Sequence, residues 1–314
     1  MLEREKDIME LSKKIEDLRQ FAEEKQADLA AEIQVLESKL EQMKTEAAEN
    51  LSPMDKLTLS RMIERPTALD YIEKVFSGFI ELHGDRKFRD DPSIVGGLAR
   101  LGDQPVTVIG QQKGRNTKEN VRRNFGMSSP EGFRKALRLM KQAEKFQRPV
   151  ICFIDTPGAD PGVGAEERGQ GEAIARNLME MAALRTPVIS IVIGEGGSGG
   201  ALALSVADEI WMLEHSVYSV LSPEGFASIL WKDASRAKEA AQLMKITAQD
   251  LKELGIIDKI LPEPPGGAHN DLERMAKVIK ENLLQVPFRS LRDGIEEVIG
   301  QRYAKYRRIG AYLE

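Results

Sequence analysis

The sequence predicts an α/β fold with a buried sheet, preceded by a helical arm. The first 52 residues contain neither glycine nor proline, whereas both are common from residue 53 onward. Beyond that point short apolar runs alternate with stretches of helical periodicity, which is typical of strands buried on both faces. The 314 residues, 41% of them apolar, are also enough to bury a sizeable core. We therefore expect an arm over residues 1–52 and one large domain over residues 53–314.

The arm has the apolar spacing of a long amphipathic helix or coiled coil. Around Gln26 the steps change, which indicates either a stutter or the bend of a helical hairpin, and both alternatives stay open. The first 50 residues carry 8 bases and 14 acids, so we expect a solvated arm that packs on its own domain or on a partner chain. The apolar positions at steps of three and four are Ile8, Leu11, Ile15, Leu18, Ala22, Leu29, Ile33, Leu36, Leu40 and Met43.

The large domain reads as alternating strands and helices in chain order. Strands are predicted at residues 106–110, 150–155, 188–193, 209–213 and 217–221. Helices are predicted at 131–146, 170–184, 200–206 and 234–244, and then, after a loop rich in proline and glycine at 262–267, at 271–284 and 290–307. This alternation favours parallel strands with helices packed on the sheet.

Composition excludes several classes of protein. Cys152 is the single cysteine, so this chain can form neither an internal disulfide nor a four-cysteine zinc site, and the composition suits a reducing cytosol. The first ten residues mix acids and bases, which is unlike a signal peptide. The most apolar stretch, 187–207, contains Glu195 and several glycines, which favours a turn in a core over a membrane span.

Two glycine-rich turns, at residues 155–164 and 194–201, each follow a predicted buried strand. Glycine at a strand end allows the backbone to approach a ligand closely, and N–H groups at the start of a helix are free to bind an anion. We expect the N–H groups of Gly199 and Gly200 to face those around residues 158–159 and to form an oxyanion site, which needs no ionisable side chain. Glycine turns with a purely structural role remain an alternative.

The second turn also fits two other motifs. Residues 194–199 satisfy the dinucleotide fingerprint G-x-G-x-x-G, and Glu214 ends the next strand, although the helix that follows is short. Residues 196–200 satisfy G-x-S-x-G, in which Ser198 would be the nucleophile of a hydrolase. Such a serine needs a base, and His215 is the best placed of three histidines. Both interpretations stay open on these residues alone.

A basic belt lies between residues 100 and 150, with 12 bases and 4 acids within a chain of net charge −5. One alternative is a solvated or salt-bridged face, and the other is a dock for a polyanionic substrate or an acidic partner. Few aromatic residues and an acidic whole disfavour nucleic acid. The densest part of the belt is Lys113, Arg115, Lys118, Arg122 and Arg123.

Seven segments of the sequence carry a resemblance to a known family. They are residues 81–86, 111–115, 123–127, 130–138, 155–159, 194–201 and 221–225. Together they resemble the α subunits of the carboxyltransferase component of bacterial acetyl-CoA carboxylases, over essentially the whole chain. More distantly, residues 100–245 resemble biotin-dependent acyl-CoA carboxyltransferases and the crotonase superfamily.

The resemblance implies a crotonase-like ββα spiral and a cytoplasmic α₂β₂ assembly with a shared active site. It implies transfer of a carboxyl group from biotin, tethered to the biotin carboxyl carrier protein, to acetyl-CoA, which gives malonyl-CoA for fatty acid synthesis. The partners implied are the carrier, biotin carboxylase and a β subunit that bears a zinc ribbon, with no metal on this chain, no membrane and no nucleic acid. A self-sufficient crotonase-like hydratase or isomerase, or a dinucleotide-binding protein, is the alternative.

The resemblance also implies roles for particular residues. Gly199 and Gly200 would donate N–H groups to the ureido oxygen of biotin as catalytic residues. Gly158, Ala159, Gly196 and Gly197 would line the biotin side. In the basic belt, Lys118, Arg122 and Arg123 would hold the phosphates of CoA or the acidic carrier protein.

Overall fold

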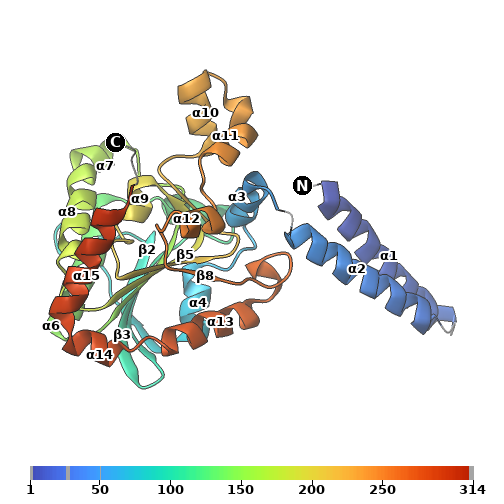
Figure 1. The fold of residues 1–314 in the computed structure, drawn as a ribbon, viewed down its shortest axis with the longest axis horizontal. Helices are drawn as coiled ribbons and strands as arrows, with labels where there is room; N and C mark the ends of the chain where they lie inside the picture. The colour runs from blue at the N-terminus through green and yellow to red at the C-terminus, as the bar shows by residue number, and fades with distance from the viewer. Residues whose placement is uncertain (1–2, 26–28, 50, 311–314) are drawn as a thin grey trace.

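In the computed structural model, which describes residues 3–25, 29–49 and 51–310, the described residues form an eight-stranded mixed sheet (Figure 1). The strands lie in the order β1-β2-β3-β4-β5-β6-β8, and β7 pairs with β5 beyond the end of β6. From β1 to β3 neighbouring strands are antiparallel, and from β3 onward they are parallel. The strands are β1 Ser77–Glu81, β2 Ile94–Leu101, β3 Gln104–Gln111, β4 Val150–Thr156, β5 Val188–Gly197, β6 Glu209–Leu213, β7 Val217–Ser219 and β8 Lys259–Leu261.

The sheet is buried on both faces. All residues of β4 and β5 are buried, and their side chains alternate between two apolar clusters. Phe153 packs in the cluster with Tyr71 of α4 (Ala68–Val75) and Ile279 of α13 (Leu272–Leu284), while Cys152 packs in the cluster with Leu139 of α6 (Pro130–Lys145). Burial raises the pKa of the Cys152 thiol to about 12, so this cysteine is held as an inert apolar side chain.

The helices cover both faces of the sheet (Figure 1). Helices α4 and α13 supply residues to one cluster, and α6, α8, α9 and α12 supply residues to the other. The α-helices from residue 53 onward are α3 Pro53–Arg61, α4 Ala68–Val75, α5 Thr117–Arg122, α6 Pro130–Lys145, α7 Val163–Glu167, α8 Gln170–Ala182, α9 Ser198–Leu202, α10 Pro223–Trp231, α11 Ala237–Leu243, α12 Ala248–Glu253, α13 Leu272–Leu284, α14 Phe288–Asp293 and α15 Ile295–Arg308.

All five predicted strands exist, although the predicted strand 217–221 ends early, at Ser219. The predicted helix 200–206 is the shorter α9, and the predicted helix 290–307 is divided at Gly294 into α14 and α15. Strands β1, β2 and β8 were missed. In β2 the cause is Gly97, where a Cβ would lie 2.0 Å from the carbonyl oxygen of Ile80, so close strand contact requires a glycine that weakens the strand pattern.

The N-terminal segment contains two helices, α1 Glu3–Lys25 and α2 Ala30–Glu49, which lie side by side (Figure 1). Arg19 of α1 forms an ion pair with Glu37 of α2. This is the hairpin alternative, although Gln26, where the sequence suggests the bend, lies outside the described residues. Ser52 then caps α3, because its hydroxyl accepts a hydrogen bond from the N–H of Asp55. The division at residue 52 into an arm and a domain stays a prediction.

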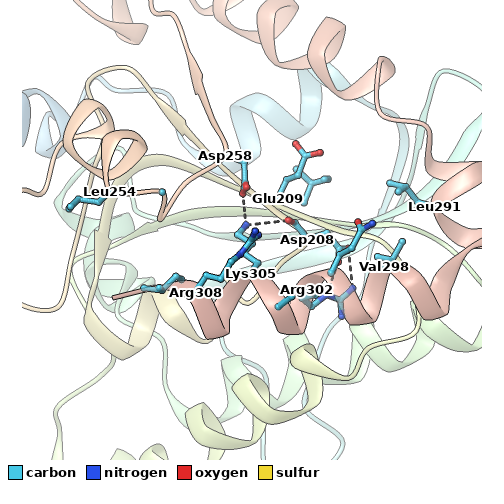
Figure 2. A pocket seen from close by; sticks show the side chains of 14 residues that line it. Asp208, Glu209, Leu254, Asp258, Leu291, Val298, Arg302, Lys305 and Arg308 are labelled. Atoms are coloured by element: carbon cyan, nitrogen blue, oxygen red, sulfur yellow. Dashed lines mark hydrogen bonds and ion pairs between the residues drawn. The ribbon is translucent and has the colours of Figure 1, made fainter. Parts of the chain in front are cut away.

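The C-terminal helix α15 is tied to the sheet by a buried cation. Arg302 donates to both carboxylate oxygens of Asp208, over 2.7 and 3.0 Å, and to the carbonyl oxygens of Met181, Leu184 and Thr186. Figure 2 shows Lys305 reaching toward Asp258 from the same helix, beside a cavity of about 680 Å³. These contacts fix the last helix against the amino ends of β5 and β6.

Candidate active site

The two glycine-rich turns meet at the carboxyl edge of the parallel strands. One follows β4 and the other leads from β5 into α9. A Cβ on Gly200 would lie 2.6 Å from the carbonyl carbon of Gly158 and 2.7 Å from the nitrogen of Ala159. A Cβ on Gly197 would lie 2.2 Å from the carbonyl oxygen of Pro157. The turns therefore touch backbone to backbone, and only glycine allows that contact.

Helix α9 begins at this contact. Ser198, its first residue, has a left-handed φ of +52°, which is uncommon for a residue other than glycine and sets a sharp turn after β5. N–H groups in the first turn of a helix have no partner within the helix, so those of Gly199 and Gly200 are available. Gly199 is partly exposed, whereas Gly200 is buried against the other turn. From the sequence we expect the N–H groups of Gly199 and Gly200 to face those of Gly158 and Ala159 across a cleft. In the structure the backbone of Gly200 instead touches that of Gly158 and Ala159 directly.

An apolar cavity of about 560 Å³ opens beside Gly199. Its walls come from α9, β7, α10, α12 and α15, and its polar groups include two tyrosines. The hydroxyl of Tyr218 lies 2.7 Å from Oγ of Ser205, and burial raises the pKa of Tyr218. Tyr306 of α15 donates to the carbonyl oxygen of Ser205 over 2.9 Å. An apolar pocket with a few fixed polar groups is the usual form of a small-molecule site.

The glycines of the second turn serve contacts within the protein. A Cβ on Gly194 would lie 2.4 Å from Oδ1 of Asp155, and one on Gly196 would lie 3.0 Å from the ring of Tyr218. Glu214, which a dinucleotide fold would use to bind a ribose, accepts a hydrogen bond from the N–H of Glu263. With a following helix of five residues, this geometry disfavours the dinucleotide interpretation.

The hydrolase interpretation lacks its base. Ser198 is exposed, whereas His215 is only 2% exposed, and burial lowers the pKa of His215. No hydrogen bond joins Ser198 to His215 in the part of the chain that the structure describes. A nucleophilic serine requires that contact.

Ion pairs that sequence spacing did not indicate support the edge of the sheet. Lys113 contacts Oδ1 of Asp155 over 2.6 Å, and the same oxygen accepts a hydrogen bond from the N–H of Glu195. The Glu195 carboxylate in turn contacts Arg61 of α3 over 2.7 Å. These side chains line a cavity of about 260 Å³. The position of Asp155 at the end of an apolar run was the one available signal.

A second pair, Arg65 with Glu263, is almost completely buried. The guanidinium reaches the two carboxylate oxygens over 2.6 and 3.0 Å and donates to the carbonyl oxygen of Ile193 in β5. Glu263 also accepts hydrogen bonds from the N–H groups of His215 and Ala268. Burial alone would raise the pKa of Glu263, but Arg65 overcomes that effect and holds the pKa below its usual value.

The basic belt is divided between paired and exposed cations. Lys113 and Arg115 pair with Asp155 and Asp70, and Arg123 donates to the carbonyl oxygen of Pro92. Burial and the neighbouring Arg122 lower the pKa of Arg123. Lys118 and Arg122 of α5 are exposed and form no ion pair within the described ranges. Within the densest part of the belt, those two residues are the ones available to an anionic partner.

Two other features are absent among the described residues. No cluster of three or more His, Cys, Asp or Glu side chains there has the arrangement of a metal site. Among the same residues, no helix combines the length and the apolar character that crossing a bilayer requires.

Solved structures with a similar fold are carboxyltransferases and a related decarboxylase. Transcarboxylase 12S superposes with a TM-score of 0.56 at 19% identity, over 70% of this chain and 42% of that chain. A chain of a Pseudomonas malonate decarboxylase hetero-tetramer superposes with a TM-score of 0.56 at 18% identity, over 77% of this chain and 98% of that chain. The chain thus has the crotonase-like α/β fold of these carboxyltransferases, as the family resemblance implied.

Closer relatives define the family. The family model described as acetyl co-enzyme A carboxylase carboxyltransferase-like matches residues 1–310. The acetyl-coenzyme A carboxylase carboxyl transferase subunit alpha of Clostridium acetobutylicum is 65% identical over 269 residues, which are 86% of this chain and 98% of that protein. The protein of the same name from Anoxybacillus flavithermus is 59% identical over 317 residues, covering 100% of this chain and 96% of that protein. This chain belongs to the acetyl-CoA carboxylase carboxyltransferase family, a family of transferases, which confirms the resemblance seen in the sequence.

Proposed function

We propose that this chain provides the biotin side of an acetyl-CoA carboxyltransferase, in which a carboxyl group moves from carboxybiotin on a carrier protein to acetyl-CoA to give malonyl-CoA. The observation that carries this proposal is the contact of Gly200 with Gly158 and Ala159, next to Gly199, which lines an apolar cavity. Family membership supports the reaction, and the cavity supports the site.

The cavity fits the ring system of biotin. Its walls are mainly apolar, its volume of about 560 Å³ is in the range of small-ligand pockets, and Ser198 and Gly199 at the start of α9 line it. Carboxybiotin supplies the carboxyl group and, once it has lost that group, the base that removes a proton from the methyl carbon of acetyl-CoA. The protein therefore needs to supply position and electrostatic stabilisation rather than an ionisable side chain.

We assign roles to the glycine turns on this basis. The N–H groups of Gly199 and Gly200 donate to the ureido oxygen and stabilise the negative charge that develops on it. Gly158 and Ala159 hold Gly200 from the other side, and Gly196 and Gly197 allow β5 to run close to Tyr218 and Pro157. The contact between the turns holds Gly200 in place, which is what electrostatic preorganisation requires of its N–H donor.

The active centre is completed by other chains in this proposal. The relatives named above are called subunit alpha, which implies a β subunit. Exposed apolar side chains gather on α10 and α11, with Ile229, Leu230 and Leu243 between 59% and 68% exposed. We assign this surface to the β subunit in an α₂β₂ complex, which works in the cytoplasm with the biotin carboxyl carrier protein and biotin carboxylase. Large exposed apolar patches are typical of protein interfaces.

The test is reconstitution. The full chain is purified alone and together with the β subunit, and transfer from carboxybiotin to acetyl-CoA is followed as malonyl-CoA. Only the complex should be active, because half of the active centre lies on each chain. Transfer by the lone chain at the rate of the complex would refute the shared site, and an inactive complex would refute the function.

The exposed cations of α5 allow a separate prediction. Replacing Lys118 and Arg122 together by alanine should raise the apparent KM for either acetyl-CoA or the carrier protein by about 3- to 10-fold, with a smaller effect at high salt, since exposed charge pairs contribute modestly. Arg123 stays in place because it donates to Pro92. The control replaces Lys277 and Lys280 of α13 by alanine, which removes the same charge elsewhere. Unchanged KM values for both substrates would refute the docking role and show that Lys118 and Arg122 only form part of a solvated surface.

A further inference from the structure

Gln111 is a buried side chain that the roles assigned above do not use. It is the last residue of β3 and is fully buried. Its amide nitrogen donates to the carbonyl oxygen of Gly200 over 2.7 Å, and its amide oxygen accepts from the N–H of Asp155 over 3.2 Å. One planar amide thus binds both glycine turns: its nitrogen binds the turn after β5, and its oxygen binds the start of the turn after β4.

The contacts around this amide make it a spacer between the turns. The last paired residues of β3 and β4 are Gly110 and Phe153, so the Gln111 side chain continues the connection between these strands beyond their backbone ladder. Gly200 has no room to move toward Gly158, because the two backbones are already so close that a Cβ added to Gly200 would overlap Gly158. A bond of 2.7 Å to the Gly200 carbonyl restrains movement in the other direction. That bond fixes the peptide group between Gly200 and Ala201, and with it the position of the Gly200 Cα, to which the Gly200 N–H is attached.

Other side chains hold the residues that directly follow α9 in the same manner. Asn177 of α8 donates to the carbonyl oxygen of Ala203, and Ser190 of β5 donates to that of Leu204. Gln111 differs from these residues, because it alone among the three also bonds to the opposite turn. A change at Gln111 therefore alters the relative position of the two turns rather than the stability of α9 alone.

We propose that Gln111 is a positioning residue for carboxyl transfer, which sets the direction of the Gly199 and Gly200 N–H groups by tying the Gly200 carbonyl to the start of the turn after β4. The inference rests on the oxyanion role proposed above for these glycines. Gln111 touches neither substrate in this proposal. It acts through the backbone, so its loss affects the transition state more than substrate binding, because small displacements of catalytic donors cost rate steeply.

The experiment uses the full chain in complex with its β subunit. Gln111→Met keeps the length of the side chain but removes both hydrogen bonds, and it should lower kcat by about 10- to 100-fold with KM for the biotin substrate changed less than about 3-fold. Gln112→Met is the matched control, since Gln112 is also buried and its amide holds the N–H of Leu69 and the carbonyl of Lys113, away from the glycine contact. Its kcat should stay within about 2-fold of the wild type, even where Tm falls as much as in Gln111→Met.

Gln111→Glu adds a second measurement, the pH dependence of its activity relative to the wild type, which a simple loss of stability would not change. A protonated carboxyl can donate to Gly200 and accept from Asp155, as the amide does, whereas the carboxylate cannot donate. Burial raises the pKa of a carboxyl, so activity relative to the wild type should rise as the pH is lowered from about 8.5 to 6. A relative activity that stays flat with pH overturns the proposal, and this profile decides the matter if Gln111→Met does not fold.

Three further outcomes have distinct meanings. A kcat within about 2-fold of the wild type for Gln111→Met overturns the positioning role, as does an equal loss of kcat in Gln112→Met at equal Tm. A wild-type complex that transfers no carboxyl group refutes the proposed function itself. The two failures are therefore told apart by the wild-type control.

Discussion

Replacing Gly200 by alanine should lower kcat for carboxyl transfer by about 10²- to 10³-fold, the loss expected for one displaced oxyanion donor. The added methyl group would lie 2.6 Å from the carbonyl carbon of Gly158 and 2.7 Å from the nitrogen of Ala159, and both are backbone atoms that cannot rotate away. One turn has to move, and the N–H groups at the start of α9 move with it. The measurement is kcat and KM of the reconstituted complex, beside circular dichroism and Tm of the chain.

Gly300→Ala is the control for this substitution. Gly300 lies inside α15, and a Cβ there would meet no atom within 4 Å. Alanine in a helix interior should stabilise the chain by about 0.5 to 1 kcal/mol and leave kcat unchanged. A Gly200→Ala complex with wild-type kcat would show that the contact between the turns does not position the donors.

Replacing Glu263 by glutamine should destabilise the chain by about 3 to 5 kcal/mol, the usual cost of breaking a buried ion pair from one side. The amide has nearly the volume of the carboxylate but leaves the buried charge of Arg65 uncompensated. It also offers one acceptor oxygen, where the carboxylate accepts from both His215 and Ala268. Urea denaturation at pH 7 gives the difference in free energy of unfolding.

The same pair predicts a dependence on pH. Arg65 holds the pKa of Glu263 below its unfolded value of about 4.3, so the stability that this carboxylate contributes is complete above that pH. The contribution is lost as the pH falls through the lower folded pKa. The gap in stability between the wild type and Glu263→Gln should therefore be constant from pH 7 to about 5 and narrow in more acidic solution.

A surface pair provides the comparison. Glu239 contacts Arg236 near the start of α11, and its side chain is 51% exposed. Glu239→Gln should leave Tm unchanged within error, because exposed ion pairs contribute little. Equal losses of stability in Glu239→Gln and Glu263→Gln would mean that burial does not make the Arg65–Glu263 pair more important for stability than a surface pair.

The parallel core of the sheet could be predicted because burial on both faces leaves continuous apolar runs in the sequence. Strands β4 and β5 stand out for that reason, and the turns after them stand out because close backbone contact requires glycine. Strand β2 was missed because Gly96 and Gly97, which allow Leu139 and β1 to approach, interrupt the pattern. The sequence pattern of a strand is thus strong where packing requires large apolar side chains and weak where it requires glycine.

The polar support of the site could not be predicted, because it depends on contacts between distant segments. Arg65 and Glu263 are 198 positions apart, and Gln111 meets Gly200 across 89. No periodicity within one helix or strand encodes such pairs, since each forms only when sheet order and register are known. The basic belt shows the same limit, because a run of cations does not reveal that Lys113 pairs with Asp155 while Lys118 stays exposed.

The order of the strands has a consequence for how the protein is made. From β1 to β6 the sheet grows in the direction of the chain, so during synthesis on the ribosome each new strand finds its neighbour already formed. Arg302 is synthesised late, yet its charge neutralises Asp208. It also donates to three carbonyl oxygens of residues that are synthesised more than a hundred positions earlier. We therefore expect nascent chains stalled before α15 to be sensitive to protease around residues 181–208, and resistance to appear only once the last helix has emerged.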